Sequence, residues 1–179
     1  MANVMRILHD NIGARAYPVK GSIAEIEVGD FVFFNNIYQG LSNQQTIQPA
    51  SSGSVGATAA NSRFQFANLF VGVSHQRHAA SSYDKNLLLS VDADVEAIIC
   101  NTTGVETTAS ADAATGTKVG IACDASRVPL DDKIVLDGIN SVTVADNEAI
   151  GFVARQVKSG DKTARVHIKG LHVFSQTGI

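Results

Sequence analysis

The sequence predicts an all-β protein that folds as a single compact β-barrel or sandwich. Short groups of Ile and Val recur along the chain, and Gly, Asp, Asn and Ser separate them at short intervals. No window sustains the i, i+3, i+4 and i+7 apolar spacing of an amphipathic helix. The chain has 179 residues, of which 45% are hydrophobic, so it can bury one substantial core. We divide it into an N-terminal arm, residues 1–20, and a barrel domain, residues 21–179.

Two short strands begin the barrel domain. Residues Ile23–Val28 alternate acidic with apolar side chains, and the Gly29-Asp30 pair predicts a turn after them. The next strand covers Phe31–Phe34.

The segment Leu41–Asn61 interrupts the strand pattern. It is made of small and polar residues with one proline and no charge. Such a segment cannot bury enough apolar area to offset its loss of conformational entropy. We therefore predict a long polar insertion loop at residues 41–62, either exposed or ordered by a neighbouring subunit.

Seven further strands are predicted. A link of small residues at Thr102–Gly116 separates two of them, and it could hold one helical turn around Ala109–Ala114. Within the second of the seven strands, every other residue from Val91 to Ile99 is apolar, and the residues between include three acids, Asp92, Asp94 and Glu96. The seven cover Phe64–Ser74, Leu87–Cys100, Lys118–Cys123, Lys133–Leu136, Ser141–Val144, Glu148–Val157 and Thr163–Phe174.

Three of these strands have a glycine between apolar residues. The sequences are FVGVS at 70–74, KVGIA at 118–122 and AIGFVA at 149–154. A glycine inside a strand marks a bulge, a bend or a close approach of another backbone. We therefore expect a strongly curved sheet.

Composition excludes several functions. A net charge of -3 and a pI near 5.9 argue against direct binding to nucleic acid or to an anionic membrane. No apolar run reaches the roughly 18 residues of a membrane helix, and the N-terminus lacks the apolar core of a signal peptide. We expect Cys100 and Cys123 to be buried free thiols rather than a disulfide.

The sequence offers no recognisable catalytic or cofactor motif. The phosphate-binding loop, the G-x-G-x-x-G fingerprint, the G-x-S-x-G elbow and H-E-x-x-H are all missing. His75 and His78 flank Arg77, so we read them as a solvated turn and not as metal ligands. Alternate acids on a strand lie roughly 6.5–7 Å apart, too far to share one calcium ion without covering loops. We predict no catalytic residue, cofactor or metal.

A basic stripe on the last strand mirrors the acidic one. Arg165, His167 and Lys169 alternate with apolar residues. The two stripes either pair across neighbouring strands or meet a charged partner surface.

The order of several motifs resembles the small capsid decoration, or cement, proteins of tailed bacteriophages. The chain reads GDFVFF (29–34), LFVGVS (69–74), VDADVEAI (91–98) and TGTKVGIA (115–122). It ends with Ile150-Gly151-Phe152-Val153-Ala154, Gly160-Asp161 and Arg165-Val166-His167-Ile168, which resembles the ending that closes the compact β-barrel in that family. The likeness covers roughly Glu27–Ile168.

The resemblance implies a virion protein, made in the host cytoplasm, that sits on the capsid exterior. Its implied partners are the major capsid protein, whose adjacent subunits it bridges, and two further copies of itself in a homotrimer. The N-terminal arm either docks on a partner, for instance by strand addition, or packs on its own barrel. The partner-binding residues we predict are Val4, Met5, Ile7, Leu8, Ile12, Arg165, His167 and Lys169.

Two alternatives stay open. The first is another non-enzymatic phage part, such as a head fibre base, a tail protein or a receptor-binding module that contacts its ligand through Leu41–Asn61. The second is a small enzyme or ligand-binding barrel with a site at a subunit interface, supplied by His75, His78, His167 and His172.

Overall fold

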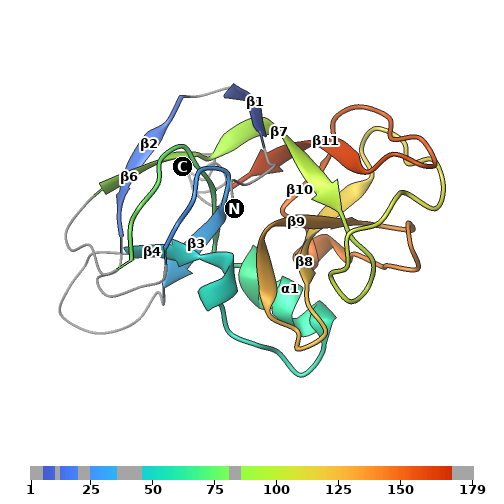
Figure 1. Ribbon diagram of the computed structural model, residues 1–179, viewed down its shortest axis with the longest axis horizontal. Helices are drawn as coiled ribbons and strands as arrows, with labels where there is room; N and C mark the ends of the chain where they lie inside the picture. The colour runs from blue at the N-terminus through green and yellow to red at the C-terminus, as the bar shows by residue number, and fades with distance from the viewer. Residues whose placement is uncertain (1–5, 11–12, 20–24, 36–45, 81–85, 171–179) are drawn as a thin grey trace, which may run out of the picture.

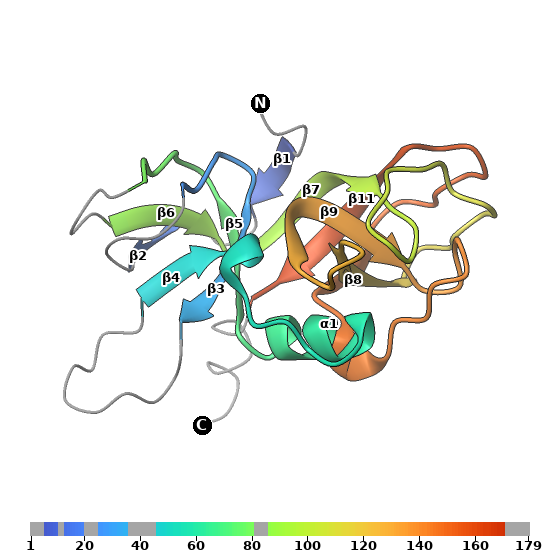
Figure 2. The same ribbon diagram turned by 60° about the horizontal axis from the view of Figure 1, so that its bottom comes forward.

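The structure is a computed structural model that describes residues 6–10, 13–19, 25–35, 46–80 and 86–170 (Figure 1). Val4, Met5, Ile12 and His172, named above, lie outside the described residues. The all-β prediction is confirmed: the described residues form a closed five-stranded barrel and a second, five-stranded sheet. Figure 2 shows the two side by side.

The barrel closes because its first strand pairs with its last. The antiparallel order β7-β11-β10-β8-β9 returns to β7 through a parallel pairing of Ile98 with Lys133 and Ile99 with Ile134. Closure leaves none of the five as a fully open edge. The strands are β7 (Asp92–Ile99), β8 (Lys118–Cys123), β9 (Pro129–Leu136), β10 (Gly151–Val153) and β11 (Thr163–Lys169).

The second sheet curls in a similar way. Its order is β2-β6-β5-β3-β4, and a parallel bridge from Val19 to Ile47 brings β4 back beside the end of β2. It encloses its own core, which includes Val32, Val71 and Leu89. The strands are β2 (Arg15–Pro18), β3 (Phe31–Asn35), β4 (Thr46–Pro49), β5 (Phe70–Ser74) and β6 (Asn86–Ser90).

The long predicted strand Leu87–Cys100 passes from one sheet to the other. It breaks at Val91 into β6 and β7, so one run of alternating residues serves both cores. The predicted alternation is confirmed, since Ala93, Val95, Ala97 and Ile99 all lie in the barrel core. Aromatic residues from the second sheet and helix α1 belong to the barrel core: Phe31 packs edge-on against Phe70, and Phe33 and Phe66 are also buried there.

The predicted polar loop at residues 41–62 is wrong for Thr46–Ser52 and from Ala59 onward, whereas residues 53–58 do form a mostly exposed connection; residues 41–45 lie outside the described residues. Strand β4, the 3-10 turn η1 (Ala50–Ser52) and helix α1 (Ala59–Ala67) occupy this segment. Ile47 is buried in the core of the second sheet and Ala50 in the barrel core, and this burial orders the segment. The helix begins at Thr58, whose hydroxyl accepts a hydrogen bond from the Asn61 N–H at 3.1 Å. The strand predicted at Phe64–Ser74 is therefore helical at first and begins at Phe70.

Other predicted strands are shorter or missing. Within Glu148–Val157 only β10 is a strand, and the 3-10 turn η2 (Asp146–Glu148) precedes it. Ser141–Val144 forms no strand, because Asn140 and Ser141 adopt positive φ and turn the chain. The described part of Ile23–Val28 contributes a single bridge, from Ile26 to His78. No helical turn forms at Ala109–Ala114.

Two glycines of the three apolar-Gly-apolar strands lie close to the backbone of a neighbouring strand. A Cβ on Gly72 would lie 2.1 Å from the Ser90 carbonyl oxygen, and one on Gly151 would lie 2.1 Å from that of His167. Each contact is with backbone of the neighbouring strand, so only glycine fits without displacing it.

The described part of the arm packs on the protein's own sheets. Strand β1 (Arg6–Asp10) pairs antiparallel with β7, and β2 pairs with β6. Ile7 contacts the barrel core, whereas Leu8 is exposed. Of the two alternatives for the arm, packing on its own barrel describes these residues.

Candidate functional site

The acidic and basic stripes lie side by side on the outer face of the barrel. The antiparallel register of β7 and β11 sets Arg165 opposite Glu96, His167 opposite Asp94, and Lys169 opposite Asp92. Side chains of directly opposed residues project from the same face of a sheet. Of the two alternatives for these stripes, pairing across neighbouring strands is therefore the one that the structure shows.

We call these opposed charges of β7 and β11 the acid–base ladder; its residues are Asp92, Asp94, Glu96, Arg165, His167 and Lys169. Asp94 is its centre. Its Oδ2 accepts hydrogen bonds from Nη2 and Nε of Arg165, at 2.7 and 3.1 Å. Its Oδ1 lies 2.9 Å from Nδ1 of His167, whose Nε2 is 3.1 Å from Oδ1 of Asp92. Burial acts to raise the pKa of Asp94, but the hydrogen bonds from His167 and Arg165 outweigh it and lower this pKa below its ordinary value. Arg165 and His167 are thus already committed to partners within the chain.

We expect Asp94→Asn to destabilise the protein by about 1 kcal/mol at pH 7, because neutral Asn makes weaker contacts with Arg165 and His167. A lowered folded-state pKa adds stability that is present above the unfolded pKa of about 3.9 and is lost as pH falls through the folded pKa. The difference between wild type and variant, measured by urea unfolding, should therefore hold from pH 7 to pH 5 and shrink below pH 4. Asp146→Asn, at a fully exposed carboxylate, is the control. A difference that grows below pH 4 would contradict this assignment.

A hollow of about 620 Å³ lies beside the ladder. Phe152 forms one side of it and packs against the His167 ring, with ring centroids 5.0 Å apart. Lys118 enters it and makes contacts of 3.2 Å with Asp146 and 3.5 Å with Asp137. Lys118 is thus already paired, whereas Lys169, the other lysine of the lining, makes no ion pair with the described residues, so its ammonium group could meet an acidic side chain. The lining residues are Gly116, Lys118, Asp146, Ala149, Ile150, Gly151, Phe152 and Lys169.

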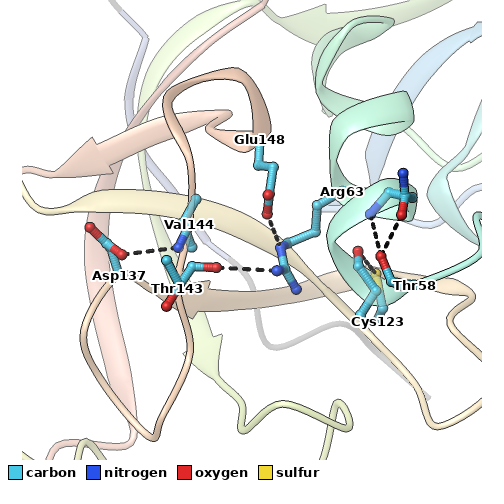
Figure 3. A network of polar contacts seen from close by, with 9 residues as sticks. Thr58, Arg63, Cys123, Asp137, Thr143, Val144 and Glu148 are labelled. Carbon is cyan, nitrogen blue, oxygen red and sulfur yellow. Dashed lines mark hydrogen bonds and ion pairs between the residues drawn. The ribbon is translucent and has the colours of Figure 1, made fainter.

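A buried ion pair ties helix α1 to the barrel, as Figure 3 shows. Nε of Arg63 donates to Oε2 of Glu148 at 2.7 Å, and Nη2 donates to the Thr143 carbonyl at 3.2 Å. Both charged side chains are about nine-tenths buried. Sequence reasoning missed this pair, although Arg63 is the one charge in a long uncharged stretch, which is a readable sign of a buried charge.

A second missed cluster joins the arm to the second sheet. The Ser90 hydroxyl donates to Oδ2 of Asp10 at 2.6 Å and also contacts Nε2 of His75, which lies 3.4 Å from the same carboxylate oxygen. In a nucleophilic triad the acid binds the other imidazole nitrogen, and the serine is accessible to substrate. Here Ser90 is fully buried and both partners share Nε2. The cluster anchors β1 beside β6.

His75 and His78, which we interpreted from the sequence as parts of a solvated turn, differ in their surroundings. His75 is partly exposed, but His78 is buried and its backbone N–H and C=O both bond to Ile26. The solvated-turn interpretation is therefore wrong for His78. Within the described ranges no three His, Cys, Asp or Glu side chains gather in a way that could hold a metal ion. Nor does any helix in the part of the chain that the structure describes have the length and apolar character needed to cross a membrane.

The prediction of buried free thiols is confirmed for both cysteines. Burial raises the pKa of Cys100 and of Cys123 to about 11. Because only the thiolate is a good nucleophile, both side chains act as small apolar core residues at neutral pH.

Comparisons with known proteins add no family. No protein-family model matches the chain, and a search of curated proteins finds none that is significantly similar.

Proposed function

We propose that this protein is a structural component of a bacteriophage virion that binds the outside of the capsid. It bridges adjacent major capsid subunits and stabilises the head, acts as a homotrimer, and catalyses no reaction. Its binding free energy comes from many copies of one interface arranged by symmetry.

The observation that carries the proposal is the place of the resembling motifs in the fold. Ile150–Ala154 contains strand β10, and Arg165–Ile168 lies within its partner β11, with Gly151 opposite Ile168 and Val153 opposite Val166. The inward residues of this ending fill the barrel core, as Val166 and Ile168 do. Of its outward residues, Arg165 and His167 belong to the acid–base ladder and Phe152 lines the hollow. One short ending thus supplies both a rigid barrel and a surface for a partner.

The charges of this surface support a protein partner. Arg165 and His167 are held by Asp94, while Lys169 and Lys118 border the hollow next to Phe152. Aromatic rings and cations beside an apolar floor favour an interface with an acidic protein segment. In this proposal a carboxylate of the major capsid protein enters the hollow.

The experiment compares phage particles that contain the protein with particles that lack it. We expect particles that lack it to lose infectivity at a lower temperature, and purified protein added back to restore heat tolerance. Lys169→Glu should restore it less, because the hollow then repels an acidic partner. Lys162→Glu, an exposed lysine just before the opposite end of β11, is the matched control. Equal heat tolerance of the two kinds of particle would overturn the proposal.

A further inference from the structure

Helix α1 and the turn before it form an exposed face that we call the α1 face. It consists of Ser54, Val55, Phe64, Gln65 and Asn68. Val55 is 47% exposed and Phe64 is 38% exposed, which makes them two of the larger apolar residues presented to solvent. Phe64 and Asn68 are one turn apart and lie on the same side of the helix.

A pocket of about 370 Å³ opens in the α1 face. Its base is apolar and aromatic, with Phe33, Phe66 and Leu69, and Pro129 of β9 closes one side. Gln65 and Asn68 of the α1 face stand at its rim together with Ser54. The face therefore presents a partly exposed phenyl ring together with a pocket able to take an apolar side chain.

The α1 face is also free of charge. Between Phe31 and Gln76, a stretch of 46 residues, the sequence has one charged residue, Arg63, whereas the chain's 17% average would give about eight. That residue is buried and paired with Glu148. Charges stand at the border only: Arg127 donates to the Ala57 carbonyl at 2.6 Å, and Asp131 accepts from the Ser51 N–H at 2.6 Å.

An uncharged centre with aromatic residues and a polar border is the composition of a protein–protein interface core. We propose that the α1 face is a self-association surface, on which a second copy of this chain docks. The pocket of one copy receives Phe64 of the other, and the aromatic side chain in the pocket carries most of the binding free energy.

Two features favour a second copy over a different protein. Copies of a protein with a net charge of -3 repel one another. An uncharged surface such as the α1 face lets two copies meet without bringing like charges together. Phe64 and the pocket also lie on one face, so each of two copies supplies both halves of the contact. A two-fold symmetric pair requires this. Two copies that meet through the same face form a two-fold dimer, so this contact is separate from the interface of the proposed trimer. The inference does not rest on the proposed function, because self-association is a property of the isolated protein.

The test is the oligomeric state of the purified full chain, measured by analytical ultracentrifugation from about 1 to about 100 μM. Wild type should self-associate. Val55→Glu and Phe64→Glu should each raise the dissociation constant roughly tenfold or more, because each places like charges in the contact. Val105→Glu is the matched control, since Val105 is 59% exposed in a loop of the barrel outside the α1 face. Circular dichroism and the unfolding midpoint check that each variant is folded.

A wild-type protein that stays monomeric over this range would overturn the proposal, and so would an oligomer that both α1-face variants leave intact. An equal loss of association in Val105→Glu would also overturn it, because the α1 face would then have no special part. If the protein is monomeric, the α1 face would instead be a docking surface for a different protein. None of these results bears on the heat tolerance of particles, so the failure of this inference and the failure of capsid binding are distinguishable.

Discussion

Arg63→Met is expected to destabilise the protein by about 3–5 kcal/mol, the usual cost of removing one partner from a buried ion pair. The substitution keeps an apolar side chain of similar length beside Gly120 and leaves the Glu148 carboxylate buried without its cation. It also removes the hydrogen bond to Thr143. Urea unfolding followed by circular dichroism measures the loss, and the midpoint should fall without a large change in slope.

The same substitution at Arg77 is the control. Arg77 pairs with Glu25 and Glu27 in solvent, with its side chain 61% exposed, so Arg77→Met should leave the midpoint almost unchanged. The double variant Arg63→Met with Glu148→Leu removes both charges and should recover most of the lost stability. A double variant as unstable as Arg63→Met alone would show that packing, and not the unpaired carboxylate, causes the loss.

Gly151→Ala is expected to destabilise the barrel by about 3 kcal/mol, the upper part of the range for overpacking. The new methyl group would lie 2.1 Å from the His167 carbonyl oxygen and 3.0 Å from Cα of Ile168. Because these are backbone atoms of β11, β10 must move away and weaken the pairing of Gly151 with Ile168. Amide hydrogen exchange in β10 and β11 should therefore accelerate more than in β3 and β5.

Gly160→Ala separates this clash from the general effect of replacing a glycine. Gly160 has a φ of +94° and no atom near its missing Cβ, so its substitution adds only backbone strain of about 1–2 kcal/mol. Equal unfolding midpoints for the two variants would contradict the close approach at Gly151.

The sequence predicts the barrel best where each strand has two different faces. Along β7 the alternation of apolar residues with acids shows which side chains face the barrel core and which face solvent. The basic stripe of β11 marks the outer face of that strand in the same way. That the two stripes pair with each other is one of the two alternatives that the sequence leaves open, and only the structure decides between them. The ion-pair partner of each charge cannot be predicted from the sequence. Arg165 stands opposite Glu96 in the strand register, but its side chain bonds to Asp94.

Helix α1 escapes sequence analysis because its inner face is polar. Ser62 and Arg63 are buried on it alongside Phe66, so no apolar stripe of helical period appears. Thr58 followed by Asn61 is the one local signal of a helix start. The burial of Arg63 depends on Glu148, 85 residues later, and the cluster of Asp10 with Ser90 spans 80 residues. Local pattern does not encode contacts of that range.

The most direct test of the central claim is a comparison of two particle maps by electron cryomicroscopy, one of complete virions and one of virions that lack this protein. The account predicts difference density on the outer surface of the head, of a size that fits the barrel and the second sheet, bridging neighbouring capsid subunits. Identical heads, or difference density confined to the tail, would contradict it.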